Sequence, residues 1–158
     1  MVFEIPHDTY IPYIEEKFDA FNKLIFGGEL PRIPIVLGSA TSVVGAFSYK
    51  ARRNFWGKKE YFDLKLRFSK KFDLPENELE DVIIHEMIHY YIHFKNLKDK
   101  SAHGPLFKNL MNQINKTFGR KISIRYRGSS ALRIHYIDHS TLQTQLQGAT
   151  KLSLKDIL

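Results

Sequence analysis

The chain has 158 residues, of which 43% are hydrophobic, and therefore fits one domain with one core. Its apolar runs are too short to cross a bilayer and its first residues lack the pattern of a secretory signal, so we expect a cytoplasmic protein with no membrane partner. The net charge is +7, and the lack of cysteine excludes disulfides and thiolate sites, so that His, Asp or Glu must hold any metal.

The first predicted elements are a helix and a small sheet. Apolar side chains recur every three or four residues over about 10–25, and Gly27-Gly28 follows, which predicts an amphipathic helix. Three short segments rich in Val, Ile, Phe and Tyr predict strands: 33–38, 43–49 and 61–68.

A second predicted helix starts near Pro75, where Pro and several acidic residues suit a helix N-terminus. Apolar residues from Leu79 to Phe94 surround most of its circumference, which indicates a buried helix. A polar loop over 96–101 leads to a third helix that starts at Pro105, runs to about residue 118 and is closed by Gly119. Residues 122–126 and 132–136 predict two more strands.

The buried helix contains the pattern H-E-x-x-H, from His85 through Glu86 to His89. Four residues along a helix span about 6 Å and just over one turn, so the two imidazoles leave the same face and can converge on one ion. Glu86 is offset around the helix by about 100° and can take a proton from a water molecule without ligating the metal. The spacing therefore predicts one zinc ion, with Glu86 as the catalytic base.

A third ligand is needed, and exclusion indicates His103. His93 lies about 12 Å along the axis from His85, which is too far for both to meet on one ion. No Glu follows Glu86, and Ile92 and Lys95 occupy the Gly and His positions of the elongated H-E-x-x-H-x-x-G-x-x-H pattern. His103 remains, just before the third helix, so we expect zinc to be held by three histidines.

Four segments together resemble the SprT-like zinc metallopeptidase family, the family of the SprT and Spartan catalytic domains. They are residues 21–31 (FNKLIFGGELP), 45–49 (GAFSY), 85–89 (HEMIH) and 103–107 (HGPLF). The resemblance implies an α+β, zincin-like domain with the buried H-E-x-x-H helix packed against a small mixed β-sheet. It also implies that His85, His89 and His103 bind zinc and that Glu86 is catalytic.

The resemblance further implies a zinc-dependent endopeptidase that hydrolyses proteins or peptides, including proteins bound or crosslinked to DNA. The catalytic domain would span residues 1–120, and residues 121–158 would form a basic extension packed on it, without the cysteine zinc ribbon of many family members. The alternative is a nucleic-acid-binding module with a structural or vestigial zinc site. A structural site normally has four protein ligands, which favours the enzyme.

The positive charge is concentrated in the last third of the chain. Residues 1–107 hold 15 Lys and Arg against 15 Asp and Glu, whereas residues 108–158 hold 9 against 2. A basic face attracts polyanions such as DNA, although it can also be a solvated surface that aids solubility. The candidate DNA contacts are Arg120, Lys121, Arg125, Arg127 and Arg133.

Other segments have two interpretations each. Residues 52–59 interleave cations with Phe55 and Trp56, which suits phosphate contacts and base stacking, or else form a hairpin loop whose rings pack on the core. For Gly45 we expect a structural role, in which the strand backbone passes close to another element, and residues 45–49 also suit an edge strand that holds a substrate backbone. Candidate donors to the oxyanion are Tyr90, Tyr91 and Tyr126. His135 and His139 share the spacing of His85 and His89, but their surroundings resemble a strand.

Overall fold

The computed structural model describes residues 7–71 and 74–124 of the chain. Its elements are α1 (His7–Ile25), β1 (Ile35–Gly38), β2 (Gly45–Arg53), β3 (Lys59–Ser69), α2 (Glu76–Phe94) and α3 (Pro105–Phe118). The three predicted helices and the first three predicted strands are present. The two hairpin strands, β2 and β3, are longer than the predicted segments 43–49 and 61–68.

The sheet is small and mixed, with strand order β1-β3-β2. The central strand β3 runs parallel to β1 and antiparallel to β2, so β2 is an edge strand of the sheet that residues 7–71 and 74–124 form. The register between β2 and β3 shifts after Ser48, and Asp63 on the opposite strand has a φ of 55°. This irregularity divides the hairpin into two parts. One part packs on the helices, and the other, called the upper arm, ends in the turn between β2 and β3.

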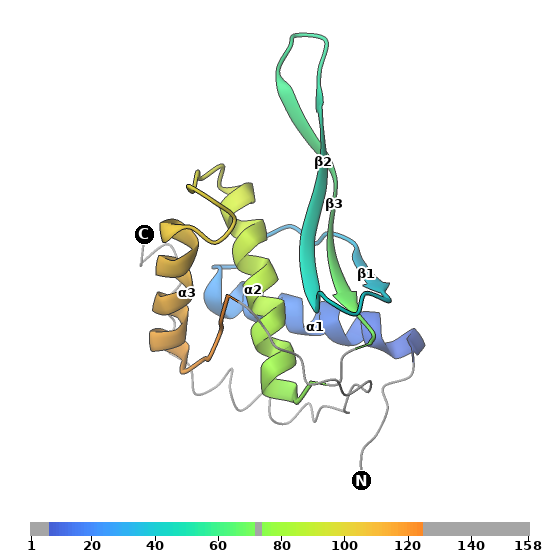
Figure 1. Cartoon of the computed structure of the whole chain (residues 1–158), viewed down its shortest axis with the longest axis vertical. Helices are drawn as coiled ribbons and strands as arrows, with labels where there is room; N and C mark the ends of the chain where they lie inside the picture. Colours follow the sequence, from blue (N-terminus) through green and yellow to red (C-terminus); the bar gives the residue numbers. More distant parts are fainter. Residues whose placement is uncertain (1–6, 72–73, 125–158) are drawn as a thin grey trace.

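The upper arm of the hairpin projects away from the helical part of the molecule (Figure 1). The side chains of β2 are partly buried as far as Ser48 and exposed from Tyr49 to Arg53. The turn at the end of the arm therefore packs against neither the helices nor β1.

The helix α2 is the centre of the fold and lies between α1, α3 and β2 (Figure 1). Twelve of its 19 residues are buried, which confirms the prediction of a buried helix and explains why apolar residues surround it. Tyr90 packs on Phe18 of α1, and Tyr91 packs on Phe26 just after that helix. Burial on several sides holds one short segment of α2, which contains His85 and His89, in a fixed orientation.

A buried network of charged groups joins α1, α2 and the end of α3. The Lys17 ammonium is 2.8 Å from Glu80, and the Arg120 guanidinium is 2.7 Å from Asp81 and 3.4 Å from Glu80. The Arg120 side chain is only 9% exposed. Arg120 was a candidate DNA contact, but these contacts place it inside the protein.

The segment after α3 differs from the prediction of a strand over 122–126. Residues 122–124 are not in a strand: the Asn115 side chain instead donates to the Ile122 carbonyl and accepts from its amide. The predicted strand at 132–136, the pair His135 and His139 and the rest of the basic extension lie outside the described residues. No helix in the described part of the chain has the length and apolar character needed to span a membrane.

Candidate metal centre

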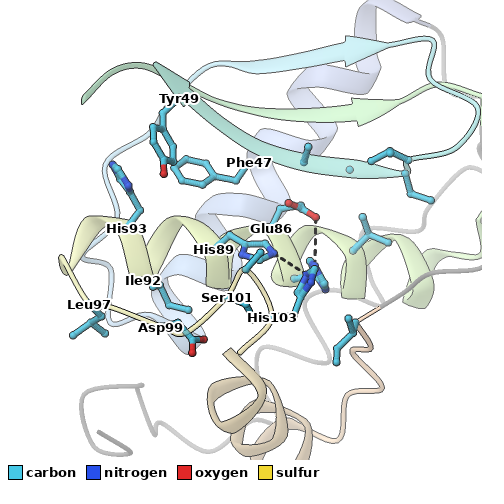
Figure 2. A pocket seen from close by; sticks show the side chains of 18 of the residues that line it. Phe47, Tyr49, Glu86, His89, Ile92, His93, Leu97, Asp99, Ser101 and His103 are labelled. Carbon is cyan, nitrogen blue, oxygen red and sulfur yellow. Dashed lines mark hydrogen bonds and ion pairs between the residues drawn. The ribbon is translucent and has the colours of Figure 1, made fainter. Parts of the chain in front are cut away.

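Three histidine side chains meet between α2 and the loop before α3. His103 Nε2 lies 3.1 Å from His89 Nε2 and 3.2 Å from His85 Nε2. One ligand atom from each residue lies within 4.8 Å of the others, so the three could hold a metal ion. The structure thus brings together the three histidines that the sequence singled out, and Figure 2 labels two of them, His89 and His103.

Asp99 positions His103. Its carboxylate accepts hydrogen bonds from the Leu106 amide at 3.3 Å and the Phe107 amide at 2.8 Å, in the first turn of α3. The N-cap residue Gly104 has no side chain for this purpose, and a Cβ there would lie 2.1 Å from Asp99 Oδ1. Asp99 therefore caps α3 from within the preceding loop, a role that the sequence analysis missed because the acid lies outside the usual capping position.

His85 is oriented by the segment that follows α3. Its Nδ1 lies 2.8 Å from the Ser123 carbonyl oxygen, which can only accept, so Nδ1 carries the proton and Nε2 of the neutral ring carries a lone pair. Metal-binding histidines commonly donate their second ring nitrogen to a carbonyl in this way. Because Asn115 holds Ile122 through two hydrogen bonds, it fixes the neighbouring Ser123.

Burial keeps His85 and His89 neutral. Burial and the neighbouring His103 lower the pKa of His85 to about 4, although the hydrogen bond to Ser123 raises it, and burial together with His85 and His103 lowers the pKa of His89 to about 3. Imidazoles that are neutral at physiological pH can present their lone pairs to a cation. Their close approach would be repulsive if lone pairs faced each other with no cation between them.

Glu86 lies beside the cluster, with Oε1 3.7 Å from His85 Nε2. Its side chain is 7% exposed, and burial raises its pKa to about 8 although a hydrogen bond from the Phe47 backbone lowers it. Figure 2 shows Glu86 on the side of the histidines that faces the sheet. A carboxylate with such a pKa can both accept and donate a proton near neutral pH.

The cluster opens into a cleft of about 910 Å³ between α2, the loop before α3 and the edge strand β2. Gly45, Ala46 and Phe47 of β2 line this cleft opposite Glu86. A Cβ on Gly45 would lie 3.1 Å from Val82 Cγ1 and 3.2 Å from Glu86 Cγ. The predicted close approach at Gly45 is confirmed: the strand passes directly over the α2 face that carries Glu86.

His93 belongs to a different group. Its ring lies against Tyr49, Tyr61 and Phe47, with centroids 4.4, 4.6 and 5.5 Å away. Figure 2 shows it turned toward Tyr49 and away from His103. It forms part of an aromatic wall at one end of the cleft.

The tyrosines in the cleft are not those that the sequence analysis considered. Tyr90 is buried and donates to the Pro31 carbonyl, and Tyr91 is buried against Phe26. Tyr126 lies outside the described residues. Tyr49 of β2 and Tyr61 of β3 line the cleft instead, and their rings meet edge to face with centroids 5.2 Å apart.

The sequence matches the model of the SprT-like family over residues 14–128. The chain belongs to the SprT-like family. The matched region contains all three clustered histidines and Glu86, together with Ser123, which orients His85.

The SprT-like relatives include the "DNA-dependent metalloprotease dvc-1" of Caenorhabditis elegans, which is 29% identical over 128 residues, or 78% of this chain and 33% of the relative. The "DNA-dependent metalloprotease SPRTN" of Xenopus tropicalis is 34% identical and that of Homo sapiens 30%, each over 116 residues; the matches cover 72% of this chain and 25% and 22% of the relatives. The chain therefore matches a third or less of each of these SprT-like proteins. No solved structure matches the chain.

Proposed function

We propose that this SprT-like chain is a zincin-type metalloendopeptidase, in which His85, His89 and His103 bind one zinc ion and Glu86 is the general base. The observation that carries the proposal is that His103 Nε2 lies 3.1 Å from His89 Nε2 and 3.2 Å from His85 Nε2, beside a buried carboxylate. The names of the relatives, which are metalloproteases, support the same chemistry.

The donor set fits zinc. Nitrogen ligands on a tetrahedral zinc, each about 2.0–2.1 Å from the ion, are about 3.4 Å apart, close to the separations of His103 Nε2 from His89 Nε2 and His85 Nε2. Three protein ligands leave a fourth position open, as in catalytic sites, whereas structural sites fill all four. Since the described residues supply three ligands here, the arrangement favours an enzyme over a nucleic-acid-binding module with a structural zinc.

When bound, zinc supplies a Lewis acid that polarises the substrate carbonyl and makes a water molecule more acidic. Glu86 takes a proton from the attacking water and delivers it to the leaving nitrogen as the peptide C–N bond breaks. The edge of β2 over residues 45–49 holds the substrate backbone by strand addition. The hydrogen bond from Phe47 holds Glu86 next to that strand.

We also propose that the substrates are proteins on DNA, because the relatives are named DNA-dependent metalloproteases. The basic residues after α3 are candidate contacts, with the exception of the buried Arg120. Lys121 is exposed and remains a candidate. The catalytic domain would extend past residue 120, since Ser123 orients His85.

The test is Glu86→Gln in the full chain, with zinc content and hydrolysis of an unfolded protein measured on the same preparation. We expect zinc to stay near one ion per chain while hydrolysis falls by about 100-fold or more, the contribution typical of a general base. Loss of zinc would make Glu86 a ligand instead. Undiminished hydrolysis would remove Glu86 from the mechanism.

A further inference from the structure

We infer that the hairpin tip, residues 52–59 at the end of the β2–β3 arm, binds single-stranded nucleic acid by stacking bases on Phe55 and Trp56. The inference rests on the proposed action on DNA-bound protein and deepens it by naming a surface that holds the DNA. It is carried by the exposure, rigidity and charge of the tip.

Phe55 is 94% exposed and Trp56 80%, the highest values among the large hydrophobic side chains in the described part of the chain. The interpretation in which these rings pack on the core is therefore wrong, because the arm carries them away from it (Figure 1). The two rings meet edge to face, with centroids 5.4 Å apart and planes at 87°. Flat ring surfaces are left open to a stacking partner.

The backbone of the tip is ordered before any ligand arrives. Asn54 Oδ1 accepts hydrogen bonds from the Trp56 and Lys58 amides, both at 2.9 Å, and its Nδ2 donates to Glu60. Arg53 donates to the Gly57 carbonyl at 2.8 Å, across a turn in which Gly57 has a φ of 74°. A ligand therefore meets aromatic rings on a preformed turn, which reduces the entropy lost on binding.

The charges of the tip suit a phosphate group. Arg53 and Lys59 are directly opposed in the register, and like charges in such a pair destabilise a hairpin. Arg52 pairs with Glu60 and Lys50 with Asp63, but Arg53 and Lys59 form no ion pair within residues 7–71 and 74–124. An anion between these two cations would relieve their repulsion.

Phosphates beside stacking surfaces are the combination that a nucleic-acid strand with unpaired bases presents. The tip is also connected to the cleft by β2, which contributes Phe47 to the cleft wall and ends at Arg53. Six residues of a β-strand span about 20 Å. A protein attached to the nucleic acid bound at the tip could therefore reach the cleft. A phospholipid surface shares the phosphate chemistry and is one outcome of the test.

Trp56 is the only tryptophan in the chain and therefore reports directly on the tip. We would titrate the full zinc-loaded chain with oligothymidylate, with inorganic polyphosphate and with phosphatidylserine-containing vesicles, following tryptophan fluorescence. We expect strong quenching by the oligonucleotide and little by polyphosphate, which has charge but no bases. A vesicle-induced blue shift without quenching by the oligonucleotide would overturn the inference in favour of a membrane contact, and no response to any of the three would also overturn it.

A second measurement uses fluorescence anisotropy of labelled oligothymidylate. The double variant Phe55→Ala/Trp56→Ala should bind about 10-fold more weakly or worse, because stacking on even one aromatic contributes substantially. Arg53→Ser/Lys59→Ser should lower the slope of log affinity against log salt concentration by about one unit. The control Lys70→Ser/Lys71→Ser changes exposed residues after β3 and should affect the affinity less. Equal affinity in the wild type and the aromatic variant would assign binding to another segment. Since none of these readouts needs hydrolysis, they are independent of the result with Glu86→Gln.

Discussion

The three clustered histidines reach their common point from two directions. His85 and His89 project from one face of α2, while His103 comes from a loop that turns back after that helix. His93, one turn beyond His89, lies within a group of aromatic rings. Being next to a candidate ligand in the helix therefore does not by itself bring a histidine to the metal.

This difference predicts opposite results for two alanine variants. Loss of a residue that only hydrogen-bonds to a metal ligand typically weakens metal binding by about 10–100-fold. His103→Ala should weaken zinc binding by more than this, because a ligand itself is lost. His93→Ala should keep the zinc affinity, since its contacts are with Tyr49, Tyr61 and Phe47. Competition with a chelating dye measures both affinities. If His103→Ala still bound zinc fully while His93→Ala bound none, His103 would be wrongly assigned as the third ligand.

The loop before α3 and the strand β2 form two walls of the cleft, and each depends on a residue with no part in the chemistry. Asp99 holds the loop by accepting hydrogen bonds from the first turn of α3. Gly45 lets β2 approach α2 closely enough for the Phe47 amide to reach Glu86.

Asp99→Ala should loosen the loop that carries His103. Loss of a helix cap typically lowers the free energy of unfolding by about 1 kcal/mol, and zinc affinity should fall as well because His103 is held less firmly. Asp99→Asn keeps one acceptor oxygen. Its stability and zinc affinity should therefore lie between those of the wild type and those of Asp99→Ala. Thermal unfolding and zinc competition measure these effects; an unchanged zinc affinity in Asp99→Ala would show that the loop is held by other contacts.

Gly45→Ala should reduce hydrolysis while leaving zinc bound. The added Cβ would lie 3.1–3.3 Å from Val82, Glu86 and Phe68, so β2 or Glu86 must move by a few tenths of an ångström. We expect kcat to fall by about 10-fold, because small displacements of a catalytic group are costly. Gly38→Ala in β1 is the matched control, since its Cβ would meet nothing within 4 Å. Equal kcat in the two variants would contradict this role.

At the scale of the whole molecule, the buried ion pairs connect the three helices. Arg120 contacts Asp81 and Glu80 of α2, and Lys17 of α1 contacts Glu80 from the other side. Burial raises the pKa of Asp81 although Arg120 lowers it, so removal of Arg120 would leave the carboxylate with less compensation for its burial. These contacts also connect the end of α3, and hence the segment with Ser123, to the helix that carries His85.

Arg120→Ala should therefore act on stability and not on DNA affinity. Breaking a buried ion pair by removing one partner typically costs about 3–5 kcal/mol of unfolding free energy. Arg32→Ala is the control: Arg32 also pairs with two acids, Asp19 and Glu15, but its side chain is 53% exposed, and the loss should be far smaller. Urea unfolding of both variants tests this, and equal losses would contradict the assignment of Arg120 to the core.

The sequence by itself determined the features that depend on local order. Helical periodicity placed His85, Glu86 and His89 on adjoining faces of one buried helix, because this relation follows from 3.6 residues per turn. Exclusion left His103 as the candidate third ligand, and the enrichment in Val, Ile, Phe and Tyr located the strands but not the length of the hairpin arm. The interpretation of residues 122–124 as a strand failed because Asn115 binds the Ile122 backbone in place of a neighbouring strand.

Only the tertiary structure decided which side chains are exposed and which distant groups meet. From composition alone, Arg120 and Arg53 are equally basic, yet one is buried against two carboxylates and the other lies at an exposed hairpin tip. Phe55 and Trp56 resemble core residues until the projecting arm is seen. The roles of Asp99 and Ser123 likewise depend on contacts between segments that only folding brings together. Exposure and long-range hydrogen bonds are set by the packing of whole elements, which no local pattern of residues records.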